Sequence, residues 1–171
     1  IWDLATSEPI STTQSELPLS ADDSLHGIAL TGGKRWLITT HGDNNVRLWD
    51  LAGPTPNSSP TVLFGHEGPV TVAVLSPSSR WLVTGSKDHT VRVWDLSRPS
   101  LRLEPALLPH PHSPGTKLSV SEDGRWLATA GHNATVRIWD LSAGTPLTPS
   151  LLFPGPESGI TAISISPHGE W

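Results

Sequence analysis

The chain has 171 residues, of which 36% are apolar and 16% charged, a balance typical of a globular domain and not of a disordered segment. Its net charge is -5 and it has no cluster of lysine or arginine, which argues against a nucleic-acid-binding surface. It contains no cysteine and no apolar run as long as a membrane helix needs. Disulfides and membrane insertion are therefore excluded, and we expect a soluble, cytoplasmic protein.

A repeat with a period of 45 residues organises the sequence. Three nearly identical stretches begin at Arg35, Arg80 and Arg125, and they read RWLITTHGDNNVRLWDL, RWLVTGSKDHTVRVWDL and RWLATAGHNATVRIWDL. Self-similarity at a period of about 20 to 50 residues indicates one supersecondary unit that is copied along the chain. All eight tryptophans belong to this repeat. They are Trp2, Trp36, Trp49, Trp81, Trp94, Trp126, Trp139 and Trp171.

Alternating apolar and polar residues between turn signals predict short strands. In chain order, the clearest strands are 61–64, 70–76, 80–86 and 90–96, with counterparts of the first expected around 103–108 and 150–153. This gives four antiparallel strands in each repeat and predicts an all-β fold. The second and third strands are too apolar for a sheet with one wet face, so we expect neighbouring sheets to cover both of their faces.

A Gly-His pair at 65–66, an aspartate in a tight turn (Asp88) and a strand that ends in Trp94 and Asp95 resemble the WD-repeat family of β-propellers. In that family, four-stranded blades surround a channel. The resemblance covers essentially the whole chain and implies one WD-repeat segment over 1–171. Its repeats lie at approximately 5–50, 51–95 and 96–140, with partial repeats at 1–4 and 141–171.

Both ends of the chain interrupt the repeat, since Ile1 and Trp171 correspond to positions inside predicted strands. Rings of this family usually have seven or eight blades. We therefore expect about four blade periods that form a partial window of a larger ring. A short native chain that assembles as an oligomer is the alternative.

A histidine, a hydroxyl and a carboxylate in one repeat could suggest a hydrolytic triad. The resemblance implies instead a buried hydrogen-bond relay between strands, in which a carboxylate finds donors and an indole N–H finds an acceptor. The expected relay residues are His66, Thr84, Asp88 and Trp94 in the second repeat, Thr39, Asp43 and Trp49 in the first, and Thr129, Asn133 and Trp139 in the third.

The relay is degraded in two of the three repeats. Ala21 and Pro111 occupy the histidine position of the first and third repeats, and Asn133 replaces the turn aspartate of the third. The second repeat is therefore expected to form the most rigid blade.

The aspartates of the three Trp-Asp pairs lie three residues after an arginine. Residues at i and i+3 of a strand point to opposite faces, so Asp50, Asp95 and Asp140 are not expected to pair with Arg47, Arg92 and Arg137. We interpret these carboxylates as solvated strand ends.

The resemblance also implies a partner-binding face, formed by the link that enters each blade and the turn between its second and third strands. By register, this face contains Ser24, His26, Gly42, Pro69, Thr71, Lys87, Pro114, Thr116, His132, Gly159 and Thr161. A protein or peptide partner, or another domain of the same longer chain, is expected. Nucleic acid, membranes, metals and cofactors are not.

The sequence thus predicts a non-catalytic protein-protein interaction scaffold or sensor region of a larger multidomain signalling protein. One alternative is a hydrolase or lyase that uses the propeller as its scaffold, with an active site outside this segment. The other is a self-assembling structural module. No polar cluster from several repeats converges by spacing, which favours the scaffold over the enzyme.

Overall fold

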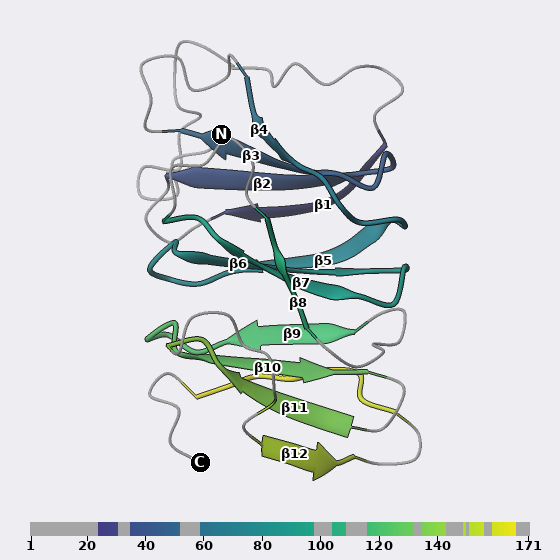
Figure 1. The fold of residues 1–171 in the computed structure, drawn as a ribbon, viewed down its shortest axis with the longest axis vertical. Helices are drawn as coiled ribbons and strands as arrows, with labels where there is room; N and C mark the ends of the chain where they lie inside the picture. The colour runs from purple at the N-terminus through teal and green to yellow at the C-terminus, as the bar shows by residue number, and fades with distance from the viewer. Residues whose placement is uncertain are drawn as a thin grey trace, which may run out of the picture.

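The computed structural model describes residues 24–30, 35–51, 59–97, 104–108, 116–131, 135–142, 149, 151–155 and 159–166. Within these ranges there are twelve β-strands and no helix. The strands form three four-stranded antiparallel sheets (Figure 1). The all-β architecture expected from the sequence is confirmed.

Each sheet is built from four strands in chain order, and we call the sheets blades 1, 2 and 3. Blade 1 contains β1 (Leu25–Leu30), β2 (Trp36–His41), β3 (Val46–Asp50) and β4 (Thr61–Leu63). Blade 2 contains β5 (Val70–Leu75), β6 (Trp81–Ser86), β7 (Val91–Asp95) and β8 (Ala106–Leu107). Blade 3 contains β9 (Lys117–Val120), β10 (Trp126–Ala130), β11 (Thr135–Asp140) and β12 (Leu151–Pro154).

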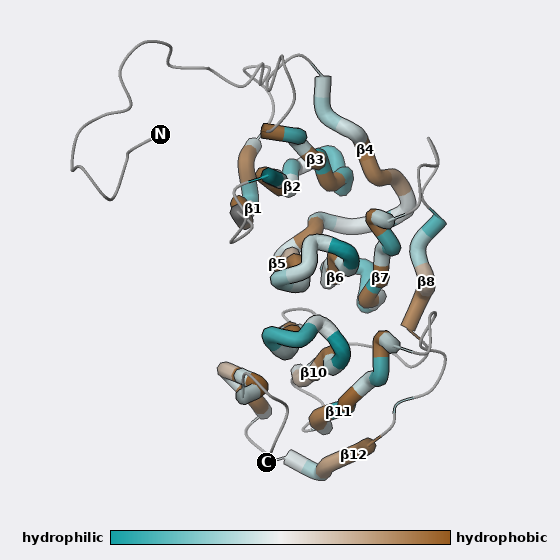
Figure 2. The backbone as a smooth tube through the Cα atoms, turned by 90° about the vertical axis from the view of Figure 1, so that its left-hand side faces the viewer, coloured by the Kyte–Doolittle hydropathy of each residue, from teal (hydrophilic) through white to brown (hydrophobic). Residues whose placement is uncertain are grey.

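The blades are stacked with equivalent strands side by side. The first strands are neighbours across the blade boundaries, because β1 contacts β5 and β5 contacts β9. In Figure 2, β1 and β5 lie on the left and the fourth strands β4 and β8 lie on the right. One edge of the stack is therefore made of inner strands and the other of outer strands.

Two apolar clusters fill the spaces between blades. The seam between blades 1 and 2 contains Ile38, Val46, Leu48, Leu63, Val70, Leu82 and Trp94. The seam between blades 2 and 3 contains Trp81, Val83, Val91, Val93, Leu108, Leu118, Leu127, Trp139 and Leu141. All six residues of β6 are buried, since Leu82 faces one seam and Val83 the other. Burial on both faces explains why Trp81, Leu82 and Val83 follow one another without a polar residue between them.

The residues at 159–166 repeat the sequence of an inner strand but are not in a strand. The Ile165 N–H donates to Ser119 Oγ at 3.2 Å. This contact places the segment beside β9, the inner strand of blade 3. The described residues thus contain three complete blades.

Candidate functional site

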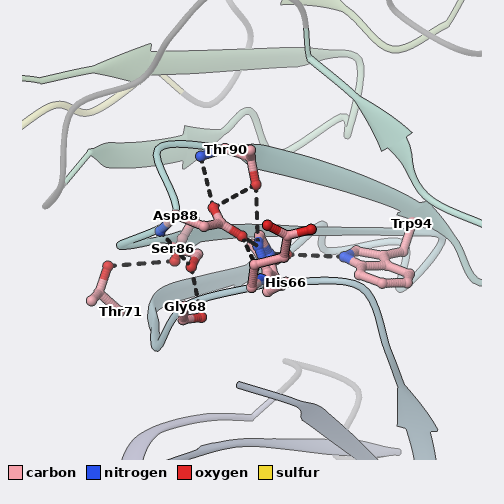
Figure 3. A network of polar contacts seen from close by, with 10 residues as sticks. His66, Gly68, Thr71, Ser86, Asp88, Thr90 and Trp94 are labelled. Atoms are coloured by element: carbon pink, nitrogen blue, oxygen red, sulfur yellow. Dashed lines mark hydrogen bonds and ion pairs between the residues drawn. The ribbon is translucent and has the colours of Figure 1, made fainter. Parts of the chain in front are cut away.

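Four side chains of blade 2 form a continuous chain of hydrogen bonds (Figure 3). Trp94 Nε1–H donates to Thr84 Oγ1 at 3.0 Å. His66 Nε2 lies 2.9 Å from the same oxygen, and His66 Nδ1 lies 2.8 Å from Asp88 Oδ2. Trp94 comes from β7, Thr84 from β6, Asp88 from the turn between them, and His66 from the link that leaves β4. The network therefore ties the incoming link to the middle of the blade.

A glycine is needed before the relay histidine. Gly65 has a φ of 138°, a conformation that side chains rarely adopt. A Cβ at this position would also lie 2.7 Å from Arg92 Nη1. The glycine of the Gly-His pair thus lets the link turn closely over the Arg92 guanidinium and deliver His66 to the blade.

The donors and acceptors assign one protonation state to His66. The Asp88 carboxylate can only accept, so His66 Nδ1–H donates to it, and in a neutral imidazole Nε2 then accepts from the Thr84 hydroxyl, whose oxygen also accepts from Trp94. Burial lowers the pKa of His66 and outweighs the opposing effect of Asp88, while the nearby Arg92 cation lowers the pKa further. His66 is therefore neutral near pH 7.

The Asp88 carboxylate is saturated with donors. Oδ2 accepts from His66 and from the Glu67 N–H at 2.9 Å. Oδ1 accepts from the Thr90 N–H at 2.8 Å and from the Thr90 hydroxyl at 2.6 Å. Burial would raise the pKa of Asp88, but these hydrogen bonds together lower its pKa well below the usual value.

This order of groups is that of a hydrolytic triad, yet it cannot act as one where it lies. The Thr84 side chain is completely buried, with an exposed fraction of 0%. Its oxygen is already occupied by the indole N–H of Trp94. A substrate carbonyl cannot approach a buried hydroxyl between two strands, so the geometry supports a structural relay.

The neutral state of His66 predicts a specific pH dependence of stability. Because burial holds its folded pKa below the unfolded value of about 6.5, the unfolded chain takes up a proton first as the pH falls. The contribution of neutral His66 to the free energy of unfolding is fully present above about pH 6.5, and it is lost as the pH falls towards the lower pKa of the folded state. We expect His66→Gln to show a smaller fall in unfolding free energy between pH 7.5 and 5.5 than the wild type, measured by urea denaturation. Equal falls in the two proteins would contradict this origin.

Blade 1 builds its relay from a histidine that the sequence analysis missed. His41 Nε2 lies 2.8 Å from Thr39 Oγ1, and Trp49 Nε1–H donates to the same oxygen at 2.9 Å. His41 is fully buried and lies two residues after Thr39 on β2, so both side chains point to the same face. The only signal in the sequence is a histidine where the second repeat has Ser86.

Asp43 has other partners than the expected ones. Its carboxylate accepts from Arg47 Nη2 at 2.8 Å and from Asn45 Nδ2 at 3.0 Å, and we find no bond to Thr39 in the described residues. Burial would raise the pKa of Asp43, but the bonds from Arg47 and Asn45 outweigh it and lower the pKa to about 2. Asp43 therefore braces the turn between β2 and β3, and the relay of blade 1 does not pass through it.

Only part of the relay of blade 3 lies in the described residues. Trp139 Nε1–H donates to Thr129 Oγ1 at 3.1 Å, as in the other two blades. Asn133, the expected third member, lies outside the described residues. The Trp–Thr bond is thus the element that all three blades share.

The Trp-Asp carboxylates are not simply solvated, which corrects the interpretation made from the sequence. Each pairs with the arginine that directly precedes the second strand of its blade. The distances are 3.2 Å for Arg35 and Asp50, 3.4 Å for Arg80 and Asp95, and 3.1 Å for Arg125 and Asp140. The same guanidinium groups lie over the rings of Trp36, Trp81 and Trp126, at 5.1, 4.6 and 4.7 Å from the ring centres.

Strand register is the reason for these pairs. Trp81 lies directly opposite Asp95 in the β6–β7 ladder, and the adjacent Arg80 reaches across both residues. Burial would raise the pKa of Asp95, but hydrogen bonds from Ser97 and Arg80 outweigh it and lower the pKa. Arg47, three residues before Asp50, pairs with Asp43 in the turn.

Removing one of these arginines should cost little. Because the Arg80 side chain is half-exposed, we expect Arg80→Ala to lower the unfolding free energy by no more than about 1 kcal/mol. The loss should shrink in high salt, when measured by urea denaturation with and without added sodium chloride. Lys117→Ala, at an exposed lysine of β9, is the control. A loss of several kcal/mol for Arg80→Ala alone would contradict a surface role.

The positions predicted to bind partners gather at one end of blades 1 and 2. The Gly42 N–H donates to the Ser24 carbonyl, and the Lys87 N–H donates to the Pro69 carbonyl, both at 3.0 Å. Thr71 interrupts the regular register of β5, as His26 interrupts that of β1.

Such bulges re-aim side chains, and the side chains of both bulge residues are exposed. The link into each blade and its β-turn thus form one surface in blades 1 and 2.

The remaining predicted face positions are less uniform. Thr116 is only 5% exposed, so its side chain is not accessible to a partner in this structure. Gly159 is partly exposed and Thr161 is exposed. Pro114 and His132 lie outside the described residues.

Two further searches concern metal ions and membranes. In the parts of the chain that the structure describes, no three histidine, aspartate or glutamate side chains are grouped so that they could hold a metal ion. The same parts contain no helix with the length and apolar character needed to cross a membrane.

Comparisons with known proteins agree with the repeat and the blades. The family model described as WD domain, G-beta repeat matches residues 13–50, 57–95 and 109–140. A search of curated proteins found no match. Among solved structures, a chain of "Crystal Structure of Mitotic Checkpoint Complex" is similar with a TM-score of 0.70 and 18% identity.

That similarity covers 88% of the present chain and 43% of the other, so the chain spans less than half the length of that protein and the likeness shows the fold. The family model, by contrast, matches more than half of the chain, in each of the three blades. The chain therefore belongs to the WD40-repeat family.

Proposed function

We propose that this chain is a non-catalytic protein-interaction scaffold or sensor region within a larger, cytoplasmic, multidomain signalling protein. One observation carries the proposal: the groups that resemble a catalytic set are buried and fully engaged in holding blade 2 together. WD40 repeats are generally interaction scaffolds, and what remains for function is the surface that the rigid blades present.

The surface proposed for the partner is the end of blades 1 and 2 that carries Ser24, His26, Gly42, Thr71 and Lys87. All five residues are exposed, and backbone hydrogen bonds hold the inner strands against the turns there. A rigid surface loses little conformational entropy on binding, which favours a protein or peptide partner. The similar solved structure is, by its title, part of a multiprotein complex, which is consistent with this kind of partner.

Site-specific photocrosslinking in the full-length protein tests this assignment. A benzoylphenylalanine at Lys87, on the proposed face, should crosslink the partner in cells. The same group at Ser97, which is equally exposed but lies at the opposite end of β7, should not. Equal crosslinking at the two positions, or crosslinking at Ser97 alone, would contradict the proposed face.

Self-assembly is the second candidate, and one observation favours it. Phe153 of β12 is 43% exposed, whereas the equivalent Leu63 and Leu108 are 3% and 2% exposed because the next blade covers them. Such an apolar surface can be covered by a further blade or by another molecule of this protein. Light scattering of the full-length protein at several concentrations tests this, since a monomer throughout would exclude self-assembly.

A further inference from the structure

A pocket of about 210 Å³ lies at the junction of blades 1 and 2, between the inner strands β1 and β5. We call it the seam pocket. Its walls include Gly27, Ala29, Ile38 and Thr40 from blade 1, and Thr71 and Ala73 from blade 2. Every lining residue is neutral and most of them are apolar.

The repeat shows why the pocket is present at this seam. One period later, Val72 and Val74 stand in place of Gly27 and Ala29, and Leu118 stands in place of Ala73. Those three larger residues pack on the apolar cluster between blades 2 and 3. The seam pocket is thus present because Gly27, Ala29 and Ala73 are smaller than the residues at the equivalent positions of the next seam.

Blades 1 and 2 also place a glycine on different strands of the pair formed by their first and second strands. In blade 2, Gly85 of β6 faces Val72 of β5, and a Cβ on Gly85 would lie 2.8 Å from Val72 Cγ1. In blade 1, Gly27 is on the inner strand and faces Thr40, whose Oγ1 lies 2.9 Å from where a Cβ of residue 27 would be. The side chain that covers the second strand in blade 2 is therefore missing over Thr40.

Among the residues that line the pocket, Thr40 has a hydroxyl group that makes no hydrogen bond within the described part of the fold. The residue is 2% exposed, and its hydroxyl oxygen has no hydrogen-bond partner among the described residues. Buried hydroxyls are normally paired, and an unpaired one is unfavourable. A hydroxyl can either donate or accept, so it suits a single polar atom on an otherwise apolar ligand.

We propose that the seam pocket binds one tyrosine side chain of the protein partner, a proposal that rests on the scaffold function above. An engineered cavity of about 150 Å³ holds benzene, so the seam pocket has room for a ring with one substituent. The neutral lining disfavours a charged group, which would lose its hydration without gaining a partner. The phenol oxygen of tyrosine pairs with the Thr40 hydroxyl. Thr71, at the wall of the pocket, belongs to the proposed partner face, so a docked partner can insert a side chain there.

The first test uses p-cresol as the probe for the tyrosine side chain. In the full-length protein with labelled methyl groups, p-cresol should cause saturable NMR shifts at Ala29, Ile38 and Ala73. Its charged analogue 4-methylbenzoate should bind at least tenfold more weakly. Equal binding of the two compounds, or shifts spread evenly over the molecule, would overturn the proposal.

The key variant copies the filled seam. Ala73→Leu introduces the residue that stands at Leu118, and it should weaken p-cresol binding at least tenfold without lowering the melting temperature. Ala106→Leu, at a partly buried alanine on the outer strand β8, is the matched control and should leave binding unchanged. If Ala73→Leu fails to fold, Ala29→Val, which copies Val74, replaces it. Binding within twofold of the wild type in a folded filled variant would overturn the proposal.

The role of the hydroxyl is tested separately with Thr40→Val, which keeps the shape and removes the polar atom. It should weaken p-cresol binding and leave toluene binding unchanged. The same effect on both compounds would refute recognition through Thr40.

Photocrosslinking from Lys87 in the Ala73→Leu variant separates this proposal from the scaffold function. Loss of p-cresol binding together with a weaker partner crosslink supports a tyrosine of the partner as the occupant. An undiminished crosslink refutes that occupant and leaves the scaffold function standing. Absence of any crosslink from Lys87 in the wild type, with p-cresol still bound, refutes the partner-binding face instead.

Discussion

Asp88→Ala is expected to lower the free energy of unfolding by about 2 to 4 kcal/mol, because the change leaves several buried donors without an acceptor. The carboxylate accepts from His66, Glu67 and Thr90, and its side chain is only 8% exposed. Urea denaturation of the full-length protein, followed by a signal from this domain, measures the loss. The variant should also lose less stability as the pH falls from about 5 to 3, because the lowered pKa of Asp88 no longer contributes to the pH dependence of unfolding.

Asp43→Ala is the matched control, since it removes the equivalent turn aspartate from blade 1. The Asp43 side chain is 36% exposed and joined to Arg47 and Asn45, so the loss should stay at or below about 1 kcal/mol. Asn133→Ala, at the same position of the third repeat, is likewise expected to cost less than Asp88→Ala. Equal losses for Asp88→Ala and Asp43→Ala would contradict the special position of blade 2.

Trp94→Ala is expected to lower the free energy of unfolding more than Asp88→Ala does, by about 3 to 5 kcal/mol. Trp94 is 0% exposed and belongs to the apolar cluster between blades 1 and 2. The change leaves a large cavity at this seam and removes the N–H that Thr84 accepts. Thermal and urea unfolding should both report the loss, and the relay should weaken because the Thr84 oxygen loses its donor.

Trp36→Ala is the control for the tryptophan itself. Trp36 is only partly buried and lies beneath the Arg35 guanidinium at the end of blade 1. Its truncation should cost less than half as much as Trp94→Ala. A similar loss for both variants would show that the two tryptophan positions of the repeat are equally embedded in the core.

The blades could be predicted from the sequence because the strand pattern recurs at a fixed spacing, whereas the relay of blade 2 is implied by the resemblance to WD repeats. In each blade a threonine of the second strand bonds to the tryptophan ten residues later in the third strand, as Thr84 does to Trp94 in blade 2. Strand register brings the two side chains together whenever the two strands form a hairpin. The bond between threonine and tryptophan therefore follows from the register of the second and third strands. The Gly-His pair does not recur in register, since Ala21 and Pro111 stand at the histidine position, and the turn aspartate is kept at Asp43 but replaced by Asn133.

Other contacts could not be predicted, because they depend on how side chains are placed in three dimensions and not on a repeated spacing. His41 bonds Thr39 from the same strand, although the register of the repeat gives no reason to expect a histidine there. The Arg80–Asp95 pair joins two residues that are 15 positions apart in sequence but adjacent at the open end of the β6–β7 hairpin, so the comparison of residues within one strand does not reveal it. Thr116 is buried, although its counterpart Thr71 is exposed.

Residue order alone establishes the period and the strands, because a repeat of 45 residues with an apolar alternation has few ways to bury itself, and its Gly-His, turn-aspartate and Trp-Asp motifs indicate the family. Packing between blades decided the rest. Leu118 fills the seam between blades 2 and 3, whereas the equivalent Ala73 leaves a pocket between blades 1 and 2. A difference of a few carbon atoms therefore creates a pocket only where two blades pack against each other. Side-chain volume at an interface is a property of both neighbours together, and neither strand shows it in isolation.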